Sequence, residues 1–131
     1  MSNAFPADRI QLAEVAPRSV GVMLRLEQSV ELPEQLRNLV ALRASQINGC
    51  AFCLDMHWKD ARASGESEER LYSLDAWRES PLYDERERAA LALCEAMTLI
   101  SDGHVPDEVW HQAEAVFDRK ELGHLVFEKQ R

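Results

Sequence analysis

Apolar residues along the chain recur at helical spacing. Between residues 34 and 48, Leu36, Leu39, Val40 and Ile47 are separated by steps that place them on one stripe of an α-helix. No segment alternates apolar and polar residues over a sustained run, and the β-branched residues that favour strands are scattered. The pattern therefore predicts an all-α domain.

Capping residues and prolines predict where the helices begin. Pro33 is expected at the first helical position of the helix at about 34–48. Asp84 and Glu87 form a capping-box pattern, and Glu87 is also a candidate for a buried salt bridge. The helix at 19–28 is apolar on most sides, so we expect it to be largely buried. The other helices are expected at about 10–15, 51–64, 67–74, 84–100, 106–117 and 118–127.

Two cysteines and a histidine are predicted to share one face of the helix at 51–64. Gly49 precedes them, at a point where the chain can turn out of one helix and into the next. Cys50 then falls at about the N-cap, Cys53 lies in the first turn, and His57 follows one turn later. Because residues three and four apart lie on the same side of a helix, both thiols and the imidazole are expected near the positive end of the helix dipole.

This placement favours a reactive thiolate. A free thiol has a pKa of about 8.5, so half ionisation at pH 7 needs a shift of about 1.5 units, or roughly 2 kcal/mol. A helix N-terminus supplies on the order of 0.3–1 kcal/mol, and a histidine one turn away can take the proton. The Cα atoms of residues i and i+3 lie roughly 5–6 Å apart, within reach of a disulfide. The spacing suits a thiolate that attacks and a second thiol that resolves.

The residues alone leave the order of the two cysteines open. Cys50, nearer the helix terminus, is expected to be the more exposed and more acidic thiol. Proximity to His57 instead favours Cys53 as the thiol that attacks.

The cysteine pair has two other interpretations, a zinc site and reduced thiols in a helix core. Structural zinc sites normally have four ligands, and the pair with its histidine gives three, while the other three histidines are spread over other predicted helices. Reduced thiols packed in a helix core are the second interpretation. Cys94, in the apolar run 89–94, is expected to be a small buried residue. No metal and no cofactor are expected.

Length and charge restrict the classes of function. A chain of 131 residues is long enough for one domain with a real core and too short for two. The net charge is -8 and no basic cluster stands out, so nucleic acid is not an expected partner. No apolar run approaches the roughly 18–20 residues that span a membrane. Residues 1–9 have no apolar stretch typical of a signal peptide, so the expected location is the cytoplasm.

The stretch from Leu36 to His57, LRNLVALRASQINGCAFCLDMH, closely resembles the signature of the carboxymuconolactone decarboxylase superfamily, in its alkylhydroperoxidase D-like (AhpD-like) branch. The likeness continues through 59–62, 76–82 and 87–91. It covers roughly residues 15–127 of a single domain, 1–131. The resemblance implies an AhpD-like helical fold of about six to seven helices, with the Cys-x-x-Cys pair at the N-terminus of a central helix. It also implies a homo-oligomer, either a trimer or a hexamer.

The activity that the resemblance implies is that of a thiol-dependent peroxidase acting on hydroperoxides. Cys53 would attack the peroxide, Cys50 would close the disulfide, and His57 would relay the proton from Cys53. A dithiol partner, lipoyl- or thioredoxin-like, would reopen the disulfide. One alternative is a redox-responsive or disulfide-exchange oligomer without peroxidase activity. A lactone decarboxylase like the founding members of the superfamily is less favoured, because those enzymes do not need the cysteine pair.

The sequence departs from the family pattern at two points. The family usually carries a glutamate twelve residues before the first cysteine, where it orients and charges the histidine, and here that position is Asn38. An amide can hold an imidazole by a hydrogen bond but cannot stabilise imidazolium by charge, so a weaker proton relay is expected. Glu34, one helical turn earlier on the same face, is a possible substitute. Family members usually extend the last helix further, whereas here it is expected to stop at residues 128–131, which bears on the expected oligomer if that helix packs subunits.

Overall fold

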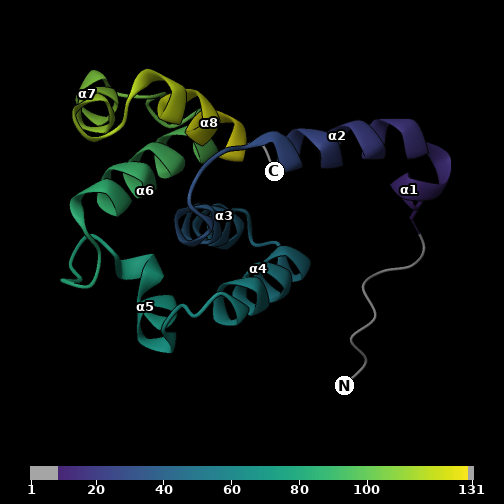
Figure 1. Cartoon of the computed structure of the whole chain (residues 1–131), viewed down its shortest axis with the longest axis horizontal. Helices are drawn as coiled ribbons and strands as arrows, with labels where there is room; N and C mark the ends of the chain where they lie inside the picture. The colour runs from purple at the N-terminus through teal and green to yellow at the C-terminus, as the bar shows by residue number, and fades with distance from the viewer. Residues whose placement is uncertain (1–8, 130–131) are drawn as a thin grey trace.

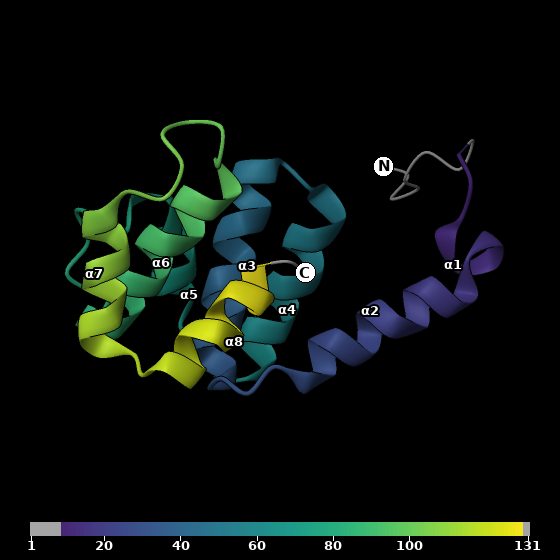
Figure 2. The same ribbon diagram turned by 90° about the horizontal axis from the view of Figure 1, so that it is seen from above.

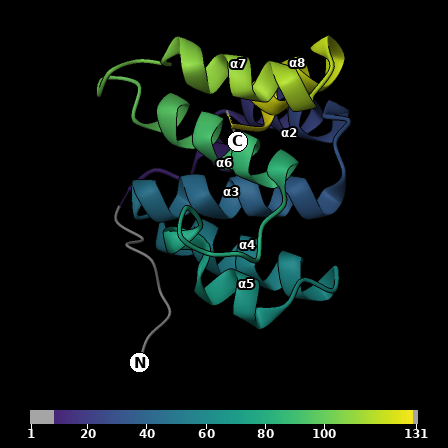
Figure 3. The same ribbon diagram turned by 90° about the vertical axis from the view of Figure 1, so that its left-hand side faces the viewer.

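Helix α3 (Glu34–Asn48) runs through the centre of the molecule, and α4, α6 and α8 pack around it (Figure 1). The computed structural model describes residues 9–129, and within that range it contains no strand. The all-α prediction is confirmed, with eight α-helices in the described range where about six to seven were expected. Figure 3 shows the helices in successive layers, with α7 and α8 above α6, then α3, α4 and α5. The remaining helices in the described range are α1 (Leu12–Val15), α2 (Pro17–Ser29), α4 (Ala51–Ala63), α5 (Glu68–Tyr72), the 3-10 helix η1 (Leu74–Ala76), α6 (Glu85–Thr98), α7 (Asp107–Val116) and α8 (Arg119–Lys129).

The central helix separates two hydrophobic clusters. On one side, Leu36 and Val40 pack with residues of α6, α7 and α8. On the other, Leu39 and Leu42 pack with residues of α4, α5, η1 and α6. A helix that contributes buried side chains to both sides has a broad apolar surface, which explains its position at the centre. The first cluster also holds Ala89, Ala90, Leu93, Cys94, Ala113, Phe117, Leu122 and Leu125, and the second holds Ala61, Leu71, Leu74, Trp77, Tyr83, Leu91 and Ala92.

The predicted helices form where capping and periodicity placed them, with ends shifted by one or two residues. Pro33 is the N-cap of α3 rather than its first helical residue. The capping box at the start of α6 is confirmed, since the Asp84 carboxylate accepts the N–H of Glu87 and the Glu87 carboxylate accepts the N–H of Asp84.

The prediction for the second helix is wrong in one respect. Helix α2 forms, but it contains no buried residue, and it projects with α1 away from the other helices (Figure 2). Val22, Met23 and Leu24 are between 52% and 61% exposed. The apolar pattern correctly indicated a hydrophobic surface, but among the described residues α2 packs mainly against α1 and α8.

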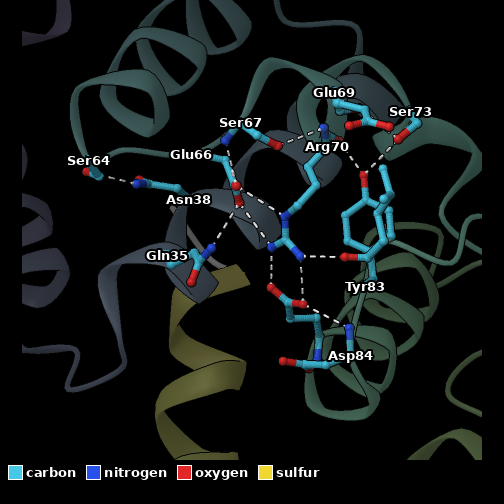
Figure 4. Close-up of polar contacts among 12 residues, drawn as sticks. Gln35, Asn38, Ser64, Glu66, Ser67, Glu69, Arg70, Ser73, Tyr83 and Asp84 are labelled. Atoms are coloured by element: carbon cyan, nitrogen blue, oxygen red, sulfur yellow. Dashed lines mark hydrogen bonds and ion pairs between the residues drawn. The ribbon is translucent and has the colours of Figure 1, made fainter.

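A buried ion-pair network attaches α5 to the start of α6 (Figure 4). The guanidinium of Arg70 donates to both carboxylate oxygens of Glu66, at 3.0 and 3.1 Å, and to both carboxylate oxygens of Glu87. Glu66 and Glu87 are only 5% and 8% exposed. Hydrogen bonds to Glu87 raise the pKa of Arg70, so the guanidinium stays charged. The predicted buried salt bridge at Glu87 is confirmed.

No helix within residues 9–129 is long and apolar enough to cross a membrane. The segment before it, on which the signal-peptide expectation rests, lies outside the described residues.

The substitution Glu87→Gln tests the ion pair separately from the cap. Glutamine keeps an oxygen that can accept the Asp84 N–H, but it removes the charge that faces Arg70. We expect a loss of about 2 kcal/mol in the free energy of unfolding, less than for a fully isolated buried charge because Glu66 still pairs with Arg70. Urea unfolding followed by circular dichroism measures it, with Glu68→Gln, at an exposed pair, as the control. A loss below about 0.5 kcal/mol, within the range of an exposed pair, would contradict the assignment.

Candidate functional site

The site begins at the turn between α3 and α4. Gly49 has φ 66° and ψ 31°, the left-handed conformation that ends many helices. The N–H of Cys50 donates to the carbonyl of Ser45 at 3.2 Å, and the N–H of Gly49 donates to the carbonyl of Gln46 at 3.3 Å. These bonds satisfy the last carbonyls of α3 and turn the chain directly into α4. The cysteines are thereby held against α3.

Cys50 is the N-cap of α4, and its sulfur accepts the N–H of Cys53 at 3.2 Å. The two cysteines are joined in a disulfide, with their Cα atoms 5.3 Å apart. Both residues are half-buried. The predicted positions at the N-cap and in the first turn are confirmed, and the three-residue spacing allows the sulfurs to bond.

His57 lies one turn further along α4 and is 5% exposed. Together with Cys50 and Cys53 it lines a cavity of about 280 Å³ between α2, α3, α4 and α8. The cavity therefore contains both sulfurs and the imidazole, as the shared helix face predicted. The other residues that line it are Val20, Met23, Leu24, Leu26, Glu27, Ala41, Ala44, Ser45, Asn48, Met56, Phe127 and Glu128.

The walls of the cavity are mostly apolar and come from several helices. Met23 and Leu24 from α2, Met56 from α4 and Phe127 from α8 all line it, and each is between 39% and 61% exposed. These side chains reach solvent, so a small molecule can approach the disulfide past apolar surface. An organic group is favoured at such a wall because its burial releases water from both surfaces.

Asn38 and Glu34 line a neighbouring cavity, which does not include the cysteines. The amide of Asn38 donates to the hydroxyl of Ser64 at 3.5 Å (Figure 4), and that hydroxyl donates to the Glu34 carboxylate at 2.9 Å. Asn38 is buried, whereas Glu34 is exposed. The family resemblance placed Asn38 beside the histidine, with Glu34 as a possible substitute. In the structure these two residues meet at Ser64, at the end of α4, and they line a different cavity from the one that His57 lines.

Glu128 also belongs to the site, although the sequence did not indicate it. Glu128 is 1% exposed and accepts a hydrogen bond from Nε of Arg37 at 2.8 Å. It follows Leu122 and Leu125 at three-residue steps, on the stripe that packs into the core. A carboxylate on a buried helical stripe was the signal that could have indicated a paired or functional charge.

Two further expectations concern the remaining cysteine and metal ligands. Cys94 is a free thiol, 2% exposed, and its sulfur donates to the carbonyl of Val40 at 3.4 Å. It is a small core residue, as predicted. Within the described part of the chain, no group of three or more histidine, cysteine, aspartate or glutamate residues is arranged to hold a metal ion.

The fold and the site define a class: an all-helical domain with a Cys-x-x-Cys pair at the start of a helix that packs against the central one, and a histidine one turn later. Comparison with known proteins agrees with that class. Residues 22–96 match the Carboxymuconolactone decarboxylase family, and the chain belongs to this family. The matched range includes both cysteines, His57 and most of α6.

Individual relatives cover most of the chain. It is 41% identical over 123 residues to the "Uncharacterized protein YdfG" of Bacillus subtilis, covering 92% of this chain and 84% of that protein. It is 36% identical over 92 residues to the "Uncharacterized protein YnjA" of Escherichia coli, covering 70% of this chain and half of that protein.

A solved structure also matches the fold. A crystal structure from Agrobacterium tumefaciens, of a protein of unknown function described as "Putative Antioxidant Defence Protein AhpD", superimposes with a TM-score of 0.88 at 38% identity. The match covers 93% of this chain and 86% of that one. The predicted AhpD-like fold is confirmed.

Two glycine substitutions test the turn that positions the cysteines. Gly49→Ala meets no atom within 4 Å but must adopt a positive φ, so we expect it to lower the free energy of unfolding by about 1–2 kcal/mol. Gly123→Ala, within helix α8 and also in open space, is expected to raise it by about 1 kcal/mol through helix propensity. Urea unfolding of the two variants measures both effects. An unchanged or raised free energy of unfolding in Gly49→Ala would show that the left-handed turn is not what Gly49 provides.

Proposed function

We propose that this protein is a thiol-dependent peroxidase that reduces hydroperoxides through a cycle between the Cys50–Cys53 dithiol and its disulfide. The observation that carries the proposal is that both sulfurs and His57 line one apolar-walled cavity. Membership of the carboxymuconolactone decarboxylase family and the likeness to a protein described as AhpD support it.

The first half of the cycle oxidises Cys53. His57 takes the proton of the Cys53 thiol, and the thiolate attacks the outer oxygen of the hydroperoxide. A sulfur–oxygen bond forms, the oxygen–oxygen bond breaks, and the leaving alkoxide takes the proton from His57 and departs as an alcohol. Cys53 is then a sulfenic acid, two electrons more oxidised than the thiol.

The second half closes and reopens the disulfide. Cys50 loses its proton, and its thiolate attacks the sulfur of Cys53. A sulfur–sulfur bond forms, the sulfur–oxygen bond breaks, and the leaving hydroxyl takes up that proton and departs as water. The N–H of Cys53, which donates to the Cys50 sulfur, would stabilise that thiolate. A dithiol reductant, lipoyl- or thioredoxin-like, then returns two electrons and two protons and becomes a disulfide itself. Such a cycle needs a reducing compartment, which agrees with the expected cytoplasmic location.

Stopped-flow oxidation tests the function and the order of the cysteines. The reduced protein is mixed with hydrogen peroxide or a small organic hydroperoxide, and the fluorescence of Trp58, on the same helix as the cysteines, is followed. We expect a fast phase that disappears in Cys53→Ser, and a sulfenic acid that can be trapped in Cys50→Ser. The apolar walls predict a larger rate constant for the organic hydroperoxide.

Other outcomes of the same experiment have defined meanings. A fast phase lost only in Cys50→Ser would reverse the order of the cysteines. Oxidation no faster than that of a free thiol would reject the peroxidase and favour the disulfide-exchange or redox-responsive alternative.

We also propose that a second copy of this chain covers the exposed face of α1 and α2. Ile10, Leu12 and Val15 are between 59% and 72% exposed, and the apolar residues of α2 continue the same surface. A contiguous apolar surface of this kind is unusual on a protein that remains monomeric. Helix α2 also forms one wall of the cysteine cavity, so assembly would bear directly on the site. The trimer or hexamer expected from the family resemblance is consistent with this surface.

The mass in solution tests the assembly. Size-exclusion chromatography with light scattering is expected to give a multiple of the 14.9 kDa chain. Val22→Asp, which does not alter the cavity lining, is expected to shift the mass toward that of one chain, because it places a charge in the apolar contact. Tyr72→Asp, at an exposed residue of α5, is the matched control and should leave the mass unchanged. A monomeric native protein would reject the proposal.

A further inference from the structure

We propose that Glu128, held by Arg37, is the carboxylate that stabilises protonated His57, in place of the glutamate that Asn38 replaces. The inference rests on the proposed function for its catalytic meaning. The effect of the carboxylate on the pKa of His57 within the cysteine cavity can be measured without any peroxide.

Protonated His57 requires a negative charge close to it. His57 is 5% exposed in a cavity with mostly apolar walls, so protonating it there is costly without a nearby negative charge. The thiolate of Cys53 supplies one such charge while it is present, but it is lost when the sulfur is oxidised. A second, permanent negative charge would keep His57 able to hold the proton until the alkoxide leaves.

The titratable groups around His57 are those that line the same cavity. Among the described residues that line the cavity, the titratable ones are Cys50, Cys53 and His57 from α4, Glu27 from α2 and Glu128 from α8. Helix α3 contributes only neutral residues to the lining, and its Arg37 contacts Glu128 from outside that lining. Two carboxylates therefore share the cavity with His57.

The two carboxylates differ in burial and in how they are held. The side chain of Glu128 is 0% exposed and is fixed by the 2.8 Å bond from Arg37. Glu27 is only half-buried, and the bond that connects it to Arg37 is made by its main-chain carbonyl, at 2.9 Å. A charge that is fully removed from water acts on its neighbours through a lower effective dielectric constant. Glu128 is therefore the better placed of the two.

Arg37 explains how a carboxylate is retained at this position. Its guanidinium also donates to the carbonyls of Glu27 and Val30, so it joins the ends of α2 and α8 to α3. The charges in the proposed site then alternate in sign. The Cys53 thiolate is negative, the His57 imidazolium is positive, the Glu128 carboxylate is negative and the Arg37 guanidinium is positive. Such an arrangement favours transfer of the thiol proton to His57.

The test is the titration of His57 in the reduced protein, followed by long-range proton–nitrogen NMR, with His57→Gln to assign its signals. In Glu128→Gln we expect the pKa of His57 to fall by about one unit or more, since an opposite charge has been removed. The peroxide rate constant at pH 7 should fall with it, by roughly tenfold per unit. Glu128→Asp, which keeps the charge, should restore part of both.

Two control variants make the result specific. Glu95→Gln removes a carboxylate that also pairs with an arginine of α3, Arg43, at 3.0 Å, but outside the cavity. It should leave the His57 titration unchanged. Glu27→Gln should have a smaller effect than Glu128→Gln. A His57 pKa that is unchanged in folded Glu128→Gln, or that moves mainly in Glu27→Gln, would overturn the inference.

A second measurement needs no substitution at Glu128. In the unmodified protein, the carboxylate carbon resonance of Glu128 should show a step at the titration midpoint of His57, and this step should be absent in His57→Gln. A missing step in the unmodified protein would also overturn the inference. If the titrations behave as expected but no peroxide is turned over, Glu128 keeps its role toward His57 and the proposed peroxidase is rejected instead.

Discussion

The left-handed turn at Gly49 is the constraint on which the site depends. It ends α3 and starts α4 within two residues, so that α4 packs directly against the central helix. A longer connection would leave Cys50 in a loop, where its sulfur could not cap a helix. The main-chain N–H of Cys53 reaches the Cys50 sulfur only because the helix begins at the next residue after Cys50. The reactivity expected of the cysteine pair therefore follows from backbone geometry.

The arginines of α3 connect this turn to the rest of the fold. Arg37 bonds to Glu128 of α8, and Arg43 bonds to Glu95 of α6. Both ion pairs are largely removed from water, so breaking either one leaves a charge without its partner in a place where solvation is poor. They determine where α8 and α6 lie relative to α3. In the case of Arg37, the same contact brings a carboxylate to the wall of the cysteine cavity.

The apolar character of α2 has two consequences. One part of the helix lines the cavity through residues that include Val20, Met23 and Leu24. The described residues leave much of its remaining surface exposed to solvent. Substrate access and assembly would then involve the same element. A second copy that covers α2 would also change access to the cavity. The disulfide-exchange and redox-responsive alternatives depend on such a connection between assembly and the cysteine pair.

The sequence by itself determined the local features of this protein. Helical periodicity, the capping box at Asp84 and Glu87, and the glycine before the cysteine pair each depend on residues within a few positions of one another, so the helices and the shared face of Cys50, Cys53 and His57 could be predicted. The tertiary structure decided the rest. Arg37 and Glu128 are 91 positions apart, and no local rule brings them together. Periodicity likewise predicted that α2 has apolar surface, but only the packing of the other helices shows that the described residues leave much of this surface exposed. Neighbours along a helix are fixed by its geometry, whereas neighbours across helices depend on how all the apolar stripes are buried at once.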